Sequence, residues 1–281
     1  MTVMTNNGSI DGVDVAGLLG IPISAEQERA VRAPLDPCVV IAGAGTGKTT
    51  VMAARVVWLV ASGLVSPEEI LGLTFTNKAT MELSERIESN LTRVGLLKPD
   101  QPRPTVATYD SFAGTLVGDY GAWDGINTGA HLMTGARAYQ LASEVVVGLD
   151  KAPLAATHLG PTPIAQAVVK LAAAMASHDA SPDEVRKADA RWRQMLLDAP
   201  TKKGGGRYAD IDTWLSRVDE REEFLELVAA YQELKKERGL VEFGDRMVQA
   251  LHLVTHHPRV GEELRARYRV VLLDEYQDTS S

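Results

Sequence analysis

A nine-residue stretch, "AGAGTGKTT" (42–50), constrains the fold of this chain more than any other feature of its sequence. It follows a short apolar run, "CVVI" (38–41), and precedes a helical pattern that ends at Gly63. A strand, a glycine-rich turn and a helix in this order form a phosphate-binding loop, in which backbone N–H groups at the helix N-terminus surround an anion. The pattern therefore predicts an α/β domain that binds a nucleoside phosphate.

The loop carries the groups that a bound nucleotide requires. Its glycines let backbone N–H groups turn inward around the β-phosphate, Lys48 supplies a charge for the β- and γ-phosphates, and the Thr49 hydroxyl suits Mg²⁺. Ala42 stands where the usual pattern has its first glycine, so the match is imperfect at this position. The nucleotide-binding residues predicted here are Ala42, Gly43, Ala44, Gly45, Thr46, Gly47, Lys48, Thr49 and Thr50.

A second motif, "RVVLLDEYQDTSS" (269–281), places two acids directly after a short apolar run. At the end of a buried strand beside a phosphate-binding loop, Asp274 can hold a metal ion and Glu275 can activate a water molecule. Both roles need the two motifs to be adjacent in one sheet, which a parallel strand order allows. The predicted catalytic residues of this nucleoside triphosphatase core are Lys48, Asp274 and Glu275, and the predicted Mg²⁺ ligands are Thr49 and Asp274.

The remaining pattern predicts how the chain is organised. Apolar segments typical of buried strands, 70–75 and 105–109, alternate with a helical stripe over 77–95, which indicates a parallel sheet with crossover helices. We expect an α/β fold, a P-loop NTPase (RecA-like) parallel sheet with helices on both faces, plus an all-helical insertion where strand signals vanish. The expected divisions are a flexible leader (1–20), a RecA-like ATPase domain in two parts (21–115 and 261–281) and a helical insertion (116–260).

The charge of the chain says little about its partners. A net charge of −8 argues mildly against nucleic acid, although a local basic groove is enough to bind a phosphate backbone. Within the helical region, the loop "TKKGGGRY" (201–208) carries basic residues that such a backbone would attract. A solvated loop is the favoured interpretation of this segment.

Cysteine content and hydropathy indicate the compartment. The single cysteine, Cys38, excludes an internal disulfide and fits a reducing cytosol, and we expect a packed thiol because an apolar run follows it. No apolar stretch approaches the roughly 18 residues that suggest a membrane span, and the N-terminal segment does not read as a secretory signal. The chain is therefore expected to be cytoplasmic, without a membrane partner.

Five motifs in a fixed order resemble those of a known family. "SAEQERAV", "AGAGTGKTT", "LTFTNKATMELSERI", "TYDSF" and "LLDEYQDTS" are similar to the successive motifs of superfamily 1 DNA helicases related to UvrD, Rep, PcrA and RecB. The most specific part is the combination of "TFTNKA" with "DEYQDT". The sequence "GTGKTT…ARVVWLVA" also resembles the motor subunits of actinobacterial helicase–nucleases of the AdnAB type.

The resemblance implies roles for further residues. Gln27 matches the glutamine that reads adenine with its side-chain amide, which favours ATP. Asp110 replaces the usual histidine of "TYDSF", and a carboxylate repels phosphate, so this position departs from the pattern. "LVEFGDRM" (240–247) resembles a weakened form of an acidic element of the family. The residues implied to line the DNA track are Thr74, Phe75, Thr76, Asn77, Thr108 and Tyr109, with Phe75 offering a face on which a base can stack.

The resemblance also implies a function. Relatives of this kind use ATP and Mg²⁺ to translocate on single-stranded DNA and to unwind duplex DNA, in repair or recombination. They carry a second motor domain with arginines that reach the γ-phosphate, and this sequence has no such part. We therefore expect the N-terminal portion of a motor, poorly active alone, whose partners are DNA, a C-terminal motor domain and, for the AdnAB type, a helicase–nuclease subunit.

Two other functions stay open at this stage. One is a degenerate nucleotide-binding module that acts as a regulator or partner without motor activity. The presence of Lys48, Thr49, Asp274 and Glu275 argues against it, because a module without catalysis does not need all four. The other is a P-loop ATPase unrelated to DNA, which would show no single-strand binding at Phe75 and Asn77.

Overall fold

A computed structural model describes residues 14–20, 22–43, 45–149, 158–202 and 205–278. These residues form two compact units. Unit 1 lies within Met1–Phe112 and Val254–Thr279, and unit 2 comprises Ala113–Leu253 apart from its undescribed residues. Unit 2 is thus inserted, in chain order, between the two parts of unit 1.

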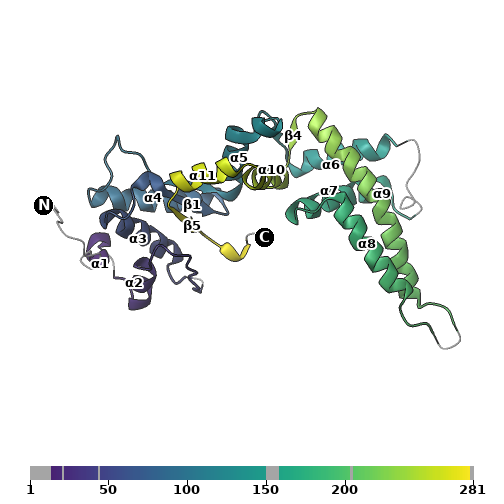
Figure 1. Ribbon diagram of the computed structural model, residues 1–281, viewed down its shortest axis with the longest axis horizontal. Coiled ribbons are helices and arrows are strands. Elements are labelled where there is room, and N and C mark those ends of the chain that lie inside the picture. The colour runs from purple at the N-terminus through teal and green to yellow at the C-terminus, as the bar shows by residue number, and fades with distance from the viewer. Residues whose placement is uncertain (1–13, 21, 44, 150–157, 203–204, 279–281) are drawn as a thin grey trace. The chain divides into compact units, whose positions relative to one another are not determined.

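Unit 1 is built around a parallel sheet of three strands among the described residues. The strands are β1 (Ile70–Thr74), β2 (Thr105–Thr108) and β5 (Val270–Leu273), in the order β2-β1-β5 (Figure 1). Leu71 of β1 pairs with Thr105 on one side and with Val271 on the other. The predicted α/β fold with a parallel sheet is confirmed.

Helices cover both faces of this sheet. Successive side chains of a strand point to opposite faces, so the apolar residues of β1 need a covering layer on each side. Ile70 and Val270 join the core formed with α3 (Lys48–Ala61) and α4 (Asn77–Arg93). Leu71 and Leu73 join a smaller cluster with Tyr268, Leu264 of α11 (Pro258–Arg267) and Phe112. All five residues of β1 are consequently buried, as expected for the central strand of a covered sheet.

The sequence explains the bounds of α4. The Thr76 hydroxyl accepts a hydrogen bond from the Ala79 N–H and caps the helix N-terminus. Leu83, Ile87 and Leu91 recur at every fourth residue and are all buried in the core of unit 1. The helix ends before Gly95, whose φ of +74° is left-handed.

Residues 14–20, expected to belong to the flexible leader, form a short capped helix. α1 (Val15–Leu19) begins at Asp14, whose side chain accepts a hydrogen bond from the Gly17 N–H. Leu19 is buried in the core of unit 1, and its carbonyl accepts a hydrogen bond from Arg93. The rest of the expected leader, residues 1–13, lies outside the described residues.

The strand expected at 38–41 does not form. Val39, Val40 and Ile41 are 73%, 52% and 95% exposed, and Cys38, expected to be packed, is exposed as well. Apolar composition favours a strand only where the run pairs with a neighbouring strand. The sheet of unit 1 consists of β2, β1 and β5 among the described residues, and residues 38–41 pair with none of them. The run therefore stays exposed before the phosphate-binding loop.

The segment before this run is fixed by one side chain. The guanidinium of Arg55, on α3, donates hydrogen bonds to the carbonyl oxygens of Val31, Ala33 and Pro34, at 3.0, 2.7 and 2.9 Å. This contact joins α3 to the C-terminal end of α2 (Ala25–Val31). Burial lowers the pKa of Arg55, which nevertheless keeps its charge at neutral pH.

Unit 2 has a helical core. Three helices, α6 (Gly135–Val147), α7 (Pro161–Ser177) and α9 (Ala209–Glu237), contribute most of its buried apolar side chains. The remaining helices with residues in this unit are α8 (Pro182–Leu197), the C-terminal part of α5 (Tyr109–Tyr120) and most of α10 (Phe243–His256). Short 3₁₀ turns lie at Pro67–Glu69, Gly121–Asp124 and Tyr276–Asp278 in the chain.

The predicted all-helical character of the insertion is wrong in one detail. β3 (His131–Leu132) and β4 (Leu240–Val241) form a parallel pair, with the His131 N–H donating to the Gly239 carbonyl at 2.8 Å. Two residues per strand are too few to give a period-two signal in the sequence. Only the tertiary structure brings these distant segments together.

A buried ion cluster holds the end of α9 to the start of α10. Lys235 is 3% exposed, and its ammonium lies 2.8 Å from Glu242 Oε2 and 2.6 Å from Asp245 Oδ2. The Tyr231 hydroxyl donates a hydrogen bond to Glu242 Oε2 at 3.0 Å. Burial, and then the Glu242 carboxylate, raise the pKa of Tyr231, so this donor stays protonated. This cluster gives the acidic element at 240–247 a structural role.

Within the described ranges, we find no helix whose length and apolar character would suit a bilayer span.

We expect Lys235→Met to lower the free energy of unfolding by about 3 kcal/mol, because it leaves two partly buried carboxylates without their cation. Lys236→Met is the matched control, since Lys236 is exposed on the next position of the same helix, and its effect should stay within about 0.5 kcal/mol. Urea unfolding followed by circular dichroism measures both. Equal effects of the two substitutions would show that the cluster is not a stabilising element.

Candidate nucleotide and DNA-strand site

The phosphate-binding loop is shaped by two glycines in left-handed conformations. Gly45 has φ +75° and Gly47 has φ +84°, and the Thr46 hydroxyl donates a hydrogen bond to the Gly43 carbonyl at 2.8 Å. Gly47 directly precedes α3, and no side chain caps this helix. The first N–H groups of α3, with the positive end of its dipole, are thus available to an anion. Ala44 lies outside the described residues.

The structure brings the loop lysine and the acid pair together. Lys48 Nζ lies 3.8 Å from Glu275 Oε1, and both side chains are about one-third exposed, at 35% and 38%. Asp274 continues the sheet, because its N–H donates to the Leu73 carbonyl at 2.9 Å. The pairing of β5 with β1 therefore delivers both acids to the edge where the phosphate-binding loop lies, as the parallel order predicts.

Glu275 has a strained backbone. Its φ of +50° is left-handed, a region that residues with a Cβ rarely occupy. Such a conformation costs on the order of 1–3 kcal/mol, and strained residues of this kind cluster at functional sites. The carboxylate also accepts a hydrogen bond from the Gln277 side chain. The strain and this contact give the Glu275 carboxylate a defined direction.

The environment of Asp274 prepares it to bind a cation. Burial raises the pKa of its carboxyl group above the usual range, and the negative charge of Glu275 raises it further, while Lys48 acts in the opposite direction. One of its oxygens accepts a hydrogen bond from the Glu275 N–H at 3.1 Å. Burial disfavours the charged form of this carboxylate, and a nearby divalent cation would stabilise that charged form.

The chemistry of the donor set fits Mg²⁺. This cation prefers oxygen ligands and is usually bound through one or two carboxylates together with substrate phosphates. Asp274 offers a carboxylate and Thr49 offers a hydroxyl at the start of α3. Among the described residues, no group of three or more His, Cys, Asp or Glu could hold a metal by itself. The site thus fits a cation that arrives with a nucleotide.

Gln27 contacts the loop directly. Its Oε1 accepts a hydrogen bond from the Ser24 N–H at 2.8 Å, and its Nε2 donates to the Thr46 carbonyl at 3.0 Å. The same amide that was expected to read adenine therefore links the N-terminus of α2 to the phosphate-binding loop. The sequence signal for the first contact was the capping box formed by Ser24 and Gln27. The second contact has no signal in the sequence.

Arg86 is a candidate that the sequence analysis did not identify. Its Nη1 donates a hydrogen bond to Thr50 Oγ1 at 2.7 Å, and its Nη2 donates to Glu82 Oε1 at 2.9 Å. Thr50 lies in the first turn of α3, two residues after Lys48. The guanidinium of Arg86, which comes from α4, therefore contacts the start of α3. No local pattern reports this contact, because α3 and α4 meet only in the folded unit.

Two of the residues implied to line the DNA track have side chains that point inward. Thr74 is fully buried, and its hydroxyl shares a 2.6 Å hydrogen bond with the Thr80 hydroxyl. Thr108 is 9% exposed, and its hydroxyl accepts a hydrogen bond from the Ser111 N–H at 3.0 Å. The expectation that these two side chains line the track is wrong. They fix the ends of β1 and β2 instead, since each bonds to the helix that follows its strand.

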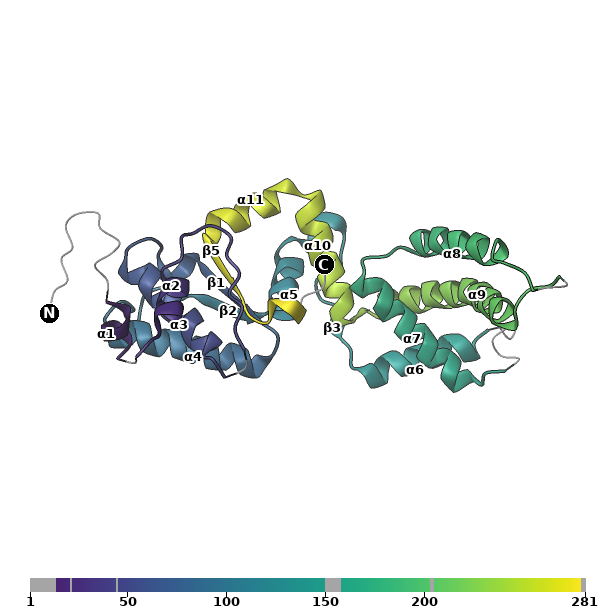
Figure 2. The same ribbon diagram turned by 90° about the horizontal axis from the view of Figure 1, so that it is seen from below.

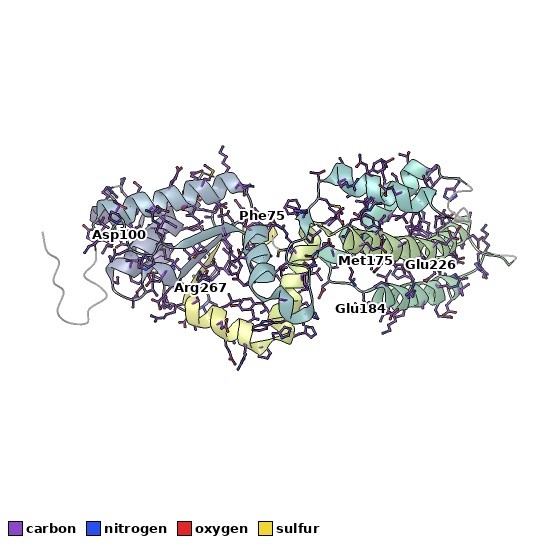
Figure 3. The ribbon with its side chains drawn as sticks, turned by 90° about the horizontal axis from the view of Figure 1, so that it is seen from above. Phe75, Asp100, Met175, Glu184, Glu226 and Arg267 are labelled. Atoms are coloured by element: carbon purple, nitrogen blue, oxygen red, sulfur yellow. The ribbon has the colours of Figure 1, made fainter. Side chains whose placement is uncertain are left out.

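The exposed part of the track is aromatic and polar. Phe75 follows β1 at the end of the sheet and is 46% exposed (Figure 3). Its ring centroid lies 5.2 Å from that of Tyr109, with an angle of 58° between the planes. Thr76 and Asn77 are also exposed. This edge therefore offers an aromatic surface and polar groups, which suit an unpaired strand.

Tyr109 connects this aromatic surface to the acid pair. Its hydroxyl donates a hydrogen bond to the backbone carbonyl of Asp274 at 3.1 Å. Burial, followed by the charge of Asp274 and the ionisable hydroxyl of Tyr276, raises the pKa of Tyr109 to about 12. The phenol therefore remains a protonated donor at neutral pH. One hydrogen bond thus links the Phe75–Tyr109 pair to the backbone that carries Asp274.

Comparisons with known proteins show which family this chain resembles. Residues 23–281 match the family described as the UvrD/REP helicase N-terminal domain. The chain is 29% identical to DNA helicase II of Escherichia coli over 96% of its own length, and 26% identical to ATP-dependent DNA helicase UvrD1 of Mycobacterium tuberculosis over its whole length. It is also 26% identical to a probable DNA helicase II homologue of Rickettsia felis over 92% of its length. The chain spans about a third of the length of these relatives.

We expect Gly47→Ala to weaken ATP binding at least about tenfold, because a left-handed residue with a Cβ is strained by about 1–2 kcal/mol and the loop would shift to relieve that strain. The added Cβ would also lie 3.4 Å from Gln27 Nε2 and press on its contact with the loop. Titration with a fluorescent ATP analogue measures the affinity.

Gly63→Ala is the matched control for this substitution. Gly63 has φ +67°, with no atom within 4 Å of an added Cβ. Both variants should therefore lose a similar amount of stability, while only Gly47→Ala loses affinity. A comparable loss of affinity in the control would mean that general destabilisation, and not the loop, is responsible.

Proposed function

Because the chain belongs to the UvrD/REP helicase N-terminal domain family, we propose that it is the ATP-binding portion of a cytoplasmic DNA helicase. ATP hydrolysis would drive translocation on single-stranded DNA and duplex unwinding, in DNA repair or recombination. The observation that carries this proposal is the approach of Lys48 to Glu275, which joins the phosphate-binding loop and the acid pair in one site. The strained Glu275 backbone supports a catalytic role at the same place.

Nucleotide binding would rearrange the ion pair of Lys48. The β- and γ-phosphates carry more charge than one carboxylate, so Lys48 would turn to them and release Glu275. The freed carboxylate would orient a water molecule and accept its proton as the water attacks the γ-phosphate. Thr49 and Asp274 would hold Mg²⁺, which neutralises phosphate charge when bound. Lys48 thus has one partner before binding and another after it.

Gln27 and Arg86 would respond to the rest of the nucleotide. Each polar atom of the Gln27 amide keeps one further hydrogen-bonding position beyond its contacts with Ser24 and Thr46. An adenine edge could use these positions, in line with the implied preference for ATP. Arg86 places a cation beside Thr50, near the polyphosphate that the loop would hold.

Efficient hydrolysis needs cations that reach the γ-phosphate in the transition state. Arginines in this role raise turnover by about 10³–10⁵ in related phosphoryl-transfer enzymes. We expect a C-terminal motor domain to supply them, as the family resemblance implies, and we expect this portion alone to hydrolyse ATP slowly. By the same resemblance, we propose that a helicase–nuclease subunit is a partner of this protein.

An unpaired DNA strand would bind along Phe75, Thr76 and Asn77, with a base stacked on the exposed Phe75 ring. The supporting observation for coupling is the hydrogen bond from Tyr109 to the Asp274 carbonyl, since Tyr109 also contacts Phe75. Strand binding would in this way adjust the backbone that carries the acid pair.

Substitutions in the nucleotide site test the proposal. Lys48→Ala should weaken Mg-ATP binding about ten- to a hundredfold, the loss of one charged hydrogen bond to phosphate. Glu275→Gln should bind at least as tightly as the unaltered chain, because Lys48 loses a competing partner, but should abolish the slow turnover. Calorimetric titration and phosphate release, with and without single-stranded oligonucleotide, are the measurements. ATP binding that does not depend on Lys48, with Lys98→Ala as an exposed control, would refute the proposed site.

Two aromatic substitutions separate strand binding from coupling. Phe75→Ala should weaken oligonucleotide binding by about 1–3 kcal/mol, because a stacking face is lost. Tyr109→Phe keeps the ring and removes only the hydrogen bond to Asp274, so strand affinity should be unchanged while strand-dependent stimulation of hydrolysis falls. Fluorescence anisotropy and phosphate release measure the two effects. Full stimulation in Tyr109→Phe would rule out this route of coupling.

A further inference from the structure

The far end of the α8–α9 pair exposes large side chains. α8 and α9 lie side by side in two perpendicular views (Figures 1 and 2). Trp192, Tyr208 and Trp214 are 54%, 50% and 45% exposed, and Met195 on α8 is 71% exposed. We call these four residues, together with Arg191, Leu197, Lys202 and Arg217, the hairpin tip. An exposed surface of this kind marks an interaction site more often than chance.

The contacts between α8 and α9 are largely made by charged side chains and not by an apolar core. Among the described residues of α8, Asp189 alone is buried, so this helix contributes almost no apolar core. Three ion pairs that cross to α9 join the helices instead: Arg186 with Glu222 at 2.8 Å, Asp189 with Arg221 at 2.5 Å, and Arg193 with Asp219. Trp192 and Trp214 contact each other across the two helices, yet about half of each side chain stays exposed, although aromatic side chains usually contribute much to a core.

Cations lie against the aromatic rings of the hairpin tip. The Arg217 guanidinium lies 5.1 Å from the centroid of the Trp214 ring, and Lys202 Nζ lies 5.6 Å from that of Tyr208. The rings of Trp192 and Trp214 are 6.3 Å apart, at an angle of 46°. At two places on the hairpin tip, a positive charge thus lies beside an exposed aromatic ring.

The charge of the hairpin tip is opposite to that of the chain. Among the described residues from Arg191 to Arg217, five are Lys or Arg and three are Asp, whereas the whole chain has a net charge of −8. Three of the five cations, Arg191, Lys202 and Arg217, form no ion pair within the described part of the chain. A polyanion is the partner that this charge complements.

We infer that the hairpin tip binds an unpaired strand of nucleic acid. Cations attract its phosphates, and indole rings stack on its exposed bases, the combination found in proteins that bind single strands without sequence preference. A duplex would use the charges but hides its base faces, and an apolar protein partner would use the rings but not the charges. The hairpin tip shares no residue with the proposed nucleotide site or with the Phe75 track.

Variants of the hairpin tip test this inference in a Phe75→Ala background, which suppresses binding at the other candidate site. The probe is a fluorescently labelled oligothymidylate, followed by anisotropy over a range of salt concentrations. Trp192→Ala/Trp214→Ala should weaken binding roughly five- to a hundredfold, from the loss of stacked bases. Arg191→Ala/Lys202→Ala/Arg217→Ala should lower the slope of log K against log salt by about 2, at about 0.7 per phosphate contact.

Matched controls carry the same changes elsewhere. Trp123→Ala removes another exposed tryptophan, and Lys98→Ala/Lys170→Ala/Arg259→Ala removes three exposed cations. Equal losses in the tip variants and the controls, or unchanged binding in the tip variants, would overturn the inference. A blunt duplex that binds as tightly, with the same dependence on the tryptophans, would overturn the assignment to an unpaired strand. The ATP affinity of the same variants should be unchanged, because the hairpin tip shares no residue with the proposed nucleotide site. This second measurement tests the proposed function separately from the hairpin tip.

Discussion

The pairing of β5 with β1 is the contact on which the candidate site depends. It joins a segment near residue 270 to one near residue 70, and the N–H of Asp274 extends the ladder by one hydrogen bond to Leu73. Without this pairing the acid pair would have no fixed place beside Lys48, because the contact described between the acid pair and the phosphate-binding loop is the partly exposed ion pair of Lys48 with Glu275. Parallel strands end at the same edge of a sheet, and that geometry converts two distant motifs into one site.

Around this edge, single side chains connect groups that we propose to bind different ligands. Gln27 joins the start of α2 to the phosphate-binding loop, and Tyr109 joins the Phe75 ring to the backbone of Asp274. Each connection is one hydrogen bond, worth on the order of 1 kcal/mol in net stability. Interactions of this size can hold a loop in one position and still yield to a ligand. They suit the proposed site, which would change with its nucleotide and its strand.

Unit 2 uses charge in two different ways. The buried Lys235 pairs with the partly buried Glu242 and Asp245, and the loss of these carboxylates would leave a buried cation uncompensated. Along α8 and α9, the ion pairs are largely exposed, and each contributes little. The first arrangement fixes one packing of the helices. The second keeps two helices aligned while leaving the tryptophans at their far end available to a partner.

The sequence by itself determined the α/β class, the phosphate-binding loop, the acid pair and the parallel order, since each depends on local periodicity or on short motifs with fixed chemistry. It also gave the start and the buried stripe of α4. Only the tertiary structure decided that residues 38–41 stay exposed, that Thr74 and Thr108 turn inward, and that Gln27, Arg86 and Tyr109 contact distant residues. The physical reason is that edge occupancy, side-chain direction and long-range hydrogen bonds depend on which elements become neighbours, and no local pattern carries that information.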